Sequence, residues 1–271
     1  MLVSSKPNSR VRPPAVAGLF YPRDAAVLHR TLHALLTEPG AAPSVGPVPK
    51  ALIVPHAGYV YSGSVAAAAY RLLAAAAQIR HVVLLGPCHR VPMRGLAVPA
   101  SDFFTTPCGE IPIDDAGRRR LSEFSLAGIS DVPHAAEHSL EVQLPFLQEM
   151  LTDFDLLPIA VGQVPPGQVA RAIEAVWGGA DTLIVVSSDL SHYHTLGEAQ
   201  QLDGLTTRSI LERRSDLSHE QACGADSING LMEIARRRGM RVELVEQRTS
   251  ADTAGDRSRV VGYGSYALFE P

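Results

Sequence analysis

The fold is decided by the stretch Lys50-Ala51-Leu52-Ile53-Val54-Pro55-His56-Ala57-Gly58-Tyr59, in which an apolar run leads directly into a turn. Residues 51–54 have the continuous apolar character of a buried strand. Pro55 and Gly58 mark the turn that follows it. His56 therefore lies where a strand passes into a loop, which is where α/β proteins place residues that contact ligands.

The same arrangement occurs twice more along the chain. The apolar run 81–86 leads into Pro87-Cys88-His89, and the apolar run 182–186 leads into a polar segment that ends at His192. Between the first two runs, Ser62 or Ser64 can begin an Ala-rich helix that continues to Gln78. A strand, a helix and a strand in succession predict a neighbouring parallel pair. The three histidines then share one edge of one sheet.

The rest of the chain alternates in the same way between apolar strands and amphipathic helices. Residues 154–161 form a further expected strand, and residues 240–246 and 258–269 alternate like half-exposed strands. We expect an α/β fold, a single-domain three-layer α/β/α sandwich with a central mixed sheet. Residues 1–12 are polar and basic, and we interpret them as a flexible N-terminal tail before a single domain at 13–271.

Composition and charge exclude several classes of protein. The chain has 271 residues and a net charge of −4, which offers no electrostatic basis for binding nucleic acid. Three scattered cysteines are too few for a disulfide framework. We find no signal peptide and no apolar run of membrane-spanning length. We therefore expect a cytoplasmic protein that does not bind a membrane.

Two histidines and one cysteine are the candidate metal ligands. His56 and His89 leave strands at the same sheet edge, and neutral imidazole binds zinc, copper, iron or nickel. Cys223 begins a helix expected at 224–238, and a helix N-terminus lowers the pKa of a thiol. The alternatives are hydrogen-bonded loop histidines and a small buried cysteine. The spacing alone does not place Cys223 beside His56.

Other polar residues are candidates for proton transfer or for supporting the ligands. Asp189 and His192 follow the third strand and can form a base with its orienting partner, or act as further ligands. The alternative is a capped turn with exposed histidines. His138 and Glu141 are three residues apart on one face of a helix, and with Tyr59 we place them around the ligands. For Glu137 a purely structural role is the favoured interpretation.

Several common catalytic motifs are absent from the sequence. There is no Gly-x-Ser-x-Gly nucleophile elbow, no glycine-rich phosphate loop and no paired Cys-x-x-Cys. These absences argue against an NTPase, a dinucleotide-dependent enzyme and a zinc finger. We therefore expect no nucleotide cofactor.

Blocks of sequence between residues 14 and 269 resemble, in order, those of the Memo family, which in prokaryotes is also called AmmeMemoRadiSam system protein B. The blocks are PAVAGLFYP (14–22), PHAGYVYSG (55–63), GPCH (86–89), EHSLEVQLPFL (137–147), SSDLSH (187–192), CG (223–224) and GDRSRVVGY (255–263). The resemblance implies a fold like that of the class III extradiol ring-cleavage dioxygenases, which use mononuclear non-haem iron. It also implies a partnership with a radical-SAM protein and an AMMECR-type protein.

Carried onto this chain, the resemblance makes His56 and His89 the two histidine ligands. Cys223 falls where the dioxygenases have a glutamate ligand, and His192 matches their acid/base histidine, with Asp189 beside it. A thiolate is a softer ligand than a carboxylate and suits copper(I), zinc or thiolate-ligated iron. The resemblance therefore implies the fold without implying dioxygenase activity.

These observations together predict a metal-dependent redox protein or oxidoreductase of unknown substrate. We expect one metal ion per chain, iron or copper, with zinc as the alternative. A zinc-type metal-assisted hydrolase is a second hypothesis, because two histidines and one cysteine leave a position for an activated water. A third is a non-catalytic protein that binds a peptide or small ligand in the same pocket.

Overall fold

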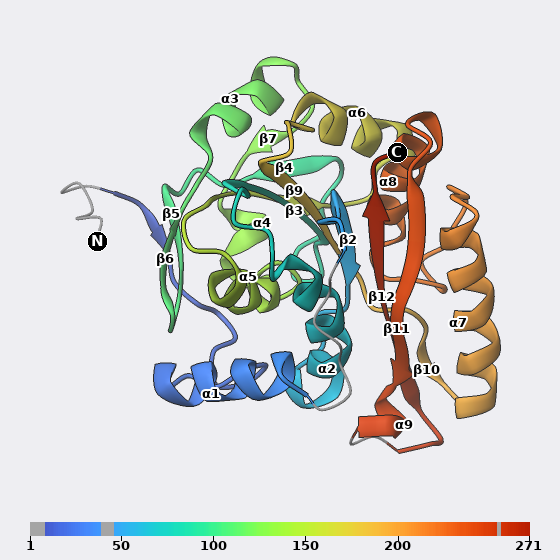
Figure 1. The fold of residues 1–271 in the computed structure, drawn as a ribbon. Helices are drawn as coiled ribbons and strands as arrows, with labels where there is room; N and C mark the ends of the chain where they lie inside the picture. Colours follow the sequence, from blue (N-terminus) through green and yellow to red (C-terminus); the bar gives the residue numbers. More distant parts are fainter. Residues whose placement is uncertain (1–8, 39–45, 254–255) are drawn as a thin grey trace.

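The computed structural model describes residues 9–38, 46–253 and 256–271. Within them, a large mixed sheet lies between helices on both of its faces (Figure 1). In spatial order its strands are β10 (His192–His194), β12 (Val260–Phe269), β2 (Ala51–Val54), β9 (Thr182–Ser187), β3 (His81–Pro87), β8 (Asp155–Val161), β4 (Leu96–Val98) and β7 (Gly128–Ile129). A further strand, β11 (Arg241–Thr249), pairs antiparallel with β12.

The centre of the sheet is parallel, so the strands that precede the histidines end at the same edge. Strand β9 pairs parallel with β2 on one side and with β3 on the other, and β3 pairs parallel with β8. The prediction that the strands at 51–54 and 81–86 are neighbours is therefore wrong, because β9 lies between them. A crossover helix fixes the direction of the strand it leads to but leaves room for another strand to insert.

Each face of the sheet has its own hydrophobic core, which explains why the central strands are apolar without interruption. Alternate residues of β2 point to opposite faces: Leu52 and Val54 join one core, and Ala51 and Ile53 join the other. The first core is covered by α1 (Ala25–Leu36), α2 (Tyr59–Tyr70) and α5 (Leu144–Met150). The second is covered by α3 (Asp115–Glu123), α6 (Pro166–Ala175), α7 (Leu196–Leu211) and α8 (Ala225–Arg237). The predicted three-layer α/β class is confirmed.

Short elements complete the described chain. They are a small sheet of β1 (Val11–Arg12), β5 (Phe103–Thr106) and β6 (Gly109–Pro112), the short helices α4 (Val132–Ala135) and α9 (Ser250–Thr253), and the 3-10 turns η1 (Arg71–Leu73) and η2 (Glu141–Gln143). None of the described helices has the length and apolar composition that crossing a bilayer requires.

The N-terminal segment and α2 differ from expectation. Residues 1–8 of the predicted tail lie outside the described residues, but Val11 and Arg12 form β1, which pairs with β5. The tail boundary at residue 12 is therefore wrong, because Arg12 is buried in an ion pair with Glu141. Helix α2 begins at Tyr59 and ends at Tyr70, so it starts immediately after the turn that contains His56.

Candidate metal centre

Segments far apart in the sequence meet at the carboxyl edge of the central sheet. His56 follows β2, His89 follows β3, and Cys223 lies just before α8. Their potential ligand atoms all lie within 4.8 Å of one another. The Cys223 sulfur is 3.3 Å from His56 Nε2, and the rings of His56 and His89 are 5.2 Å apart between centroids. The contact between Cys223 and His56, which the spacing does not predict, is present.

Close packing of the loop before α8 brings Cys223 to this edge. The Gly224 N–H donates to Ser188 Oγ at 2.9 Å, and the Cys223 N–H donates to the Asp189 carbonyl at 3.3 Å. A Cβ on Gly224 would lie 2.7 Å from Ser188 Cβ, which is closer than side chains approach. The glycine after the cysteine is therefore required for the thiol to reach the two imidazoles.

A chain of buried hydrogen bonds fixes which nitrogen of His56 faces the other ligands. Its Nδ1 is 2.9 Å from Ser187 Oγ, whose hydroxyl donates to the Ser139 carbonyl at 2.6 Å. Ser187 Oγ also accepts from Gln143 Nε2 at 2.9 Å. Because a hydroxyl has one proton, Ser187 must accept from His56 Nδ1–H. The unprotonated Nε2 then points toward Cys223.

Gln143 is held in that orientation by Tyr70. The Tyr70 hydroxyl donates to Gln143 Oε1 at 2.9 Å, and Gln143 Nε2 also donates to the Pro55 carbonyl at 2.9 Å. Burial raises the pKa of Tyr70 well above its ordinary value, so the hydroxyl keeps the proton it donates. The donor and the acceptor of each hydrogen bond from Tyr70 through Gln143 and Ser187 to His56 are therefore fixed.

Glu137 holds His89 in the corresponding way. Its carboxylate accepts from His89 Nδ1 at 2.9 Å and from the His89 backbone N–H at 2.5 Å. It also accepts from the backbone N–H groups of His138 and Ser139, each at 3.0 Å. Burial alone would raise the pKa of Glu137, but the hydrogen bonds from His89 and Ser139 outweigh it and lower the pKa to about 2. His89 Nδ1 thus carries the proton, and Nε2 is free to bind.

The importance of Glu137 is the main result that sequence reasoning missed. The residue precedes a His-Ser pair and has no recognisable catalytic spacing, so a structural role was the favoured interpretation. The available signals were its adjacency to His138 within a polar loop and its place at the start of the Memo-like block at 137–147. A carboxylate that receives four N–H groups, one of them from a candidate ligand, fixes the geometry of that ligand.

His138 lies against both candidate histidine ligands. Its ring is stacked on His89 at 4.8 Å between centroids and is edge-on to His56 at 5.4 Å. Burial, together with repulsion from His56 when that ring is protonated, lowers the pKa of His138 to about 4. Its buried Nδ1 lies 3.3 Å from Glu137 Oε1, outside hydrogen-bond geometry. His138 is thus a neutral imidazole packed between both candidate histidine ligands and the Glu137 carboxylate.

The protonation of His56 and of Cys223 follows from burial. Burial, with the neighbouring charge on His89, lowers the pKa of His56 to about 3, so its imidazole is neutral at pH 7. Burial, with the nearby Asp189 carboxylate, raises the pKa of Cys223 to about 12. The predicted lowering of the thiol pKa by the helix N-terminus is therefore wrong. Losing contact with water outweighs the helix dipole here.

Asp189 and His192 lie beside the group but do not form the expected pair. Asp189 Oδ1 accepts from the His56 backbone N–H at 2.7 Å, and burial raises the pKa of this carboxyl. His192 Nδ1 donates instead to the Leu190 carbonyl at 2.9 Å, which leaves Nε2 unprotonated when the ring is neutral. A backbone carbonyl, rather than Asp189, therefore orients His192.

Glu141 and Tyr59 lie elsewhere. The Glu141 carboxylate pairs with Arg12 and accepts from the Tyr21 hydroxyl at 2.6 Å and from two backbone N–H groups of the N-terminal segment. The Tyr59 hydroxyl donates to the Val142 carbonyl at 2.9 Å. The prediction that Glu141 and Tyr59 lie around the candidate ligands is therefore wrong. Glu141 anchors the N-terminal segment, and Tyr59 anchors the chain at Val142.

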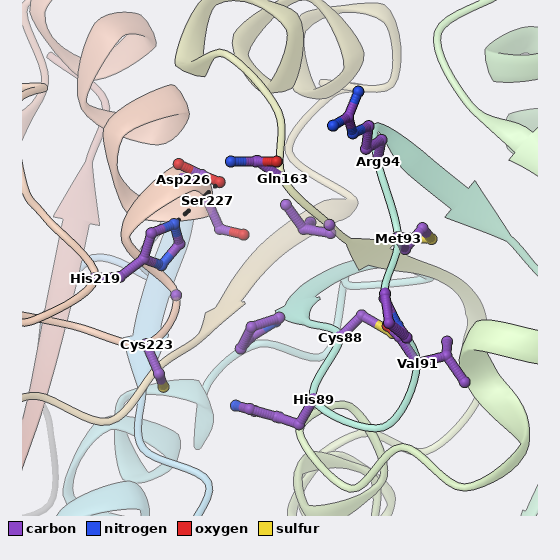
Figure 2. A pocket seen from close by; sticks show the side chains of 15 residues that line it. Cys88, His89, Val91, Met93, Arg94, Gln163, His219, Cys223, Asp226 and Ser227 are labelled. Carbon is purple, nitrogen blue, oxygen red and sulfur yellow. Dashed lines mark hydrogen bonds and ion pairs between the residues drawn. The ribbon is translucent and has the colours of Figure 1, made fainter.

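Residues of the group and its neighbours line two cavities. One, of about 810 Å³, is lined by His89 and Cys223 together with the loop after β3 and the start of α8 (Figure 2). The other, of about 620 Å³, is lined by His138, Asp189 and His192. Two of the candidate ligands therefore line one cavity, and the groups able to transfer protons line the other.

The donor set fits a metal ion. Each of the two imidazoles is held by a hydrogen bond at Nδ1, which leaves its Nε2 as the possible ligand atom and is how proteins hold metal-binding histidines. The Cys223 thiol completes the group. A second group, His89, Glu137 and His138, shares one histidine with the first. The Glu137 carboxylate of this second group already accepts N–H donors, so we assign Glu137 the role of orienting His89 rather than of binding metal.

Fold and site together define an α/β protein with a possible His/His/Cys metal-binding group at the carboxyl edge of a mixed sheet. A family model described as Memo-like protein matches residues 12–267. The chain belongs to the Memo family, as the resemblance predicted.

Proteins from distant prokaryotes are similar over nearly their whole length. A "MEMO1 family protein" of Aquifex aeolicus is 35% identical, with 94% of this chain and 97% of the relative covered. One from Ignicoccus hospitalis is 37% identical with the same coverage, and one from Thermotoga neapolitana is 32% identical, with 95% and 99% covered. Among solved structures, the uncharacterized protein JW3007 from Escherichia coli K12 superimposes with a TM-score of 0.51 at 11% identity, covering 82% of this chain and 100% of that one. This last likeness concerns the fold alone.

Proposed function

We propose that this protein binds one metal ion through His56, His89 and Cys223 and acts as a metal-dependent oxidoreductase. The observation that carries the proposal is the orientation of the donors. Ser187 and Glu137 each engage the Nδ1 of one imidazole, which leaves Nε2 of each ring as its possible ligand atom, and His56 Nε2 lies 3.3 Å from the Cys223 sulfur. Imidazoles that were merely structural would have no need of such an arrangement.

The donor set favours a soft or borderline metal. Two imidazoles with one thiolate suit copper(I), zinc or thiolate-ligated iron better than magnesium or calcium, which prefer oxygen. We propose iron or copper as the resident metal. When bound, such an ion supplies one-electron chemistry. It also takes the place of the Cys223 proton, which the protein alone holds tightly.

His192 is the group proposed to move a proton. The Leu190 carbonyl holds its Nδ1–H, so Nε2 is the atom that can accept or return a proton at the cavity it lines. Asp189 supports the site through the His56 backbone N–H rather than through His192. The neighbouring imidazole of His138 stays neutral and keeps this wall of the cavity free of a second positive charge.

Metal analysis of protein purified without chelators tests the ligand assignment. We expect about one equivalent of metal in the wild type and little in His56→Ala or Cys223→Ser. His29→Ala and Cys108→Ser are the matched controls, because His29 is exposed on α1 and Cys108 belongs to the small sheet's turn. Equal metal content in all five proteins would refute the assignment.

The identity of the metal then decides the class of chemistry. Paramagnetic resonance of the native protein and consumption of oxygen in the presence of a reductant are the expected signs of iron or copper. A metal content that is entirely zinc, with no redox signal, would overturn the oxidoreductase proposal. It would favour hydrolysis, with His192 receiving the proton of a water molecule.

A further inference from the structure

The larger cavity contains more than the candidate ligands. Helix α8, which has 13 residues, begins at its wall, two residues after Cys223 (Figure 2). The first N–H groups of a helix lack acceptors inside the helix and carry its positive dipole end. Here the N–H of Gly224 is bound by Ser188 and that of Ala225 by the Ala222 carbonyl. The next two N–H groups, those of Asp226 and Ser227, have no acceptor among the described residues.

A buried hydroxyl at the same place is also unpartnered. Ser227 is 0% exposed, and its Oγ has no hydrogen-bond partner among the described residues. The side chain lines the cavity and points into it (Figure 2). A buried hydroxyl without a partner destabilises the fold. Its position is explained if a bound group supplies the missing acceptor.

Arg94, Asp226 and His219 are the ionisable side chains near this point of the cavity. Arg94 lines the cavity and forms no ion pair among the described residues. The carboxylate of Asp226 faces His219, 3.5 Å from its Nε2, so its charge is directed toward that ring (Figure 2). The donors at the start of α8 are thus a hydroxyl and two N–H groups, and the Arg94 guanidinium belongs to another part of the same cavity's lining. Together they match the acceptors of an oxyanion.

We propose that the start of α8 is an oxyanion subsite that holds the carboxylate or phosphate end of a small organic substrate. The reacting end of that molecule then lies toward His89 and Cys223, which line the same cavity. This second statement rests on the proposed metal function, whereas the subsite itself does not. The substrate class is accordingly a small organic acid or phosphate ester.

Binding of inorganic phosphate and of acetate to the protein as purified tests the subsite. Each anion is titrated separately at constant ionic strength while the backbone amide resonances of Asp226 and Ser227 are followed by NMR. We expect saturable shifts at these two amides, and the anion that binds more tightly identifies the chemistry. Ser227→Ala should weaken binding about tenfold or more, which corresponds to the loss of one charge-assisted hydrogen bond.

Matched variants separate this subsite from general charge effects. Arg94→Met should also weaken binding, whereas Arg90→Met, at an exposed arginine that does not line the cavity, should leave it unchanged. Removing the unsatisfied hydroxyl should leave Ser227→Ala at least as stable as the wild type, so a folding defect will not mimic the effect.

The outcomes distinguish this inference from the metal assignment. Absence of shifts at Asp226 and Ser227 up to saturating anion overturns the subsite and leaves the metal ligands unaffected. Binding that Ser227→Ala does not change, but that vanishes with the metal, also overturns it. If the purified protein contains no metal but still binds the anion in a way that depends on Ser227, the subsite is supported and the proposed redox function fails.

Discussion

Replacing Glu137 by glutamine is the most informative perturbation of the candidate centre. The change keeps the shape of the side chain but removes the charge that receives four N–H groups. A pKa of about 2 against an ordinary 4.5 corresponds to about 3 kcal/mol of preference for the charged carboxylate. Part of that preference orients His89. We expect Glu137→Gln to lower metal affinity by roughly 10–100-fold, the usual effect of losing a carboxylate behind a ligating histidine.

The affinity is measured by competition with a chromophoric chelator, using Co²⁺ because its thiolate complexes absorb in the near ultraviolet. Glu141→Gln is the matched control. It removes a second buried carboxylate four residues along the chain, but one that contacts Arg12 and Tyr21 instead of a candidate ligand. We expect this control to lower the melting temperature while the folded protein retains its cobalt affinity.

Two results would refute the reasoning. One is a cobalt affinity in Glu137→Gln that equals that of the wild type, since the carboxylate would then have no influence on His89. The other is an equal loss of affinity in both variants, which would mean that metal binding merely follows stability. Retention of the thiolate absorption in Glu137→Gln at saturating cobalt would show that Cys223 still binds and that the defect lies with the imidazole.

Three further predictions concern stability and are checked by urea unfolding. Burial lowers the pKa of His134 to about 4. Between pH 6.5 and 4 the unfolded chain therefore binds a proton at this residue that the folded protein does not bind. The contribution of His134 to the free energy of unfolding is complete above pH 6.5 and falls by up to about 3 kcal/mol as the pH drops toward 4. His134→Gln should reduce this slope, and an unchanged slope would contradict the assignment. Ser227→Ala should raise the free energy of unfolding by roughly 1 kcal/mol, because it removes an unsatisfied hydroxyl and favours helix; a decrease would show that the hydroxyl is bonded in the free protein. Arg12→Met should cost about 3–5 kcal/mol by leaving Glu141 buried without its cation, and Glu141→Gln in the same chain should restore part of the loss if the ion pair is responsible.

The central strands could be predicted because their signal is local. Strands buried on both faces must be apolar throughout, and the polar residues that follow them mark the carboxyl edge. The sequence therefore predicts that His56 and His89 leave that edge. It does not predict that β9 lies between their strands, since the order of strands depends on how crossovers pack, which no short pattern records.

The supporting residues could not be predicted for a related reason. Glu137 and Glu141 are four residues apart in one polar segment and look equivalent, yet one contacts His89 and the other contacts Arg12. The difference arises from the turn between them and from an N-terminal segment 125 positions away along the chain. Likewise, the pKa of Cys223 depends on its burial against Asp189, which outweighs the local helix.

The chain of hydrogen bonds from Tyr70 to His56 has a consequence for the speed and strength of ligand capture. Because each group in it can donate in only one direction, the protein selects the tautomer of His56 before anything binds. An incoming ion meets a lone pair already aimed at it, so little free energy is spent on reorganising the site. The small reorganisation cost is a property of residues that never touch the ion, and it makes the rigidity of the core a determinant of affinity.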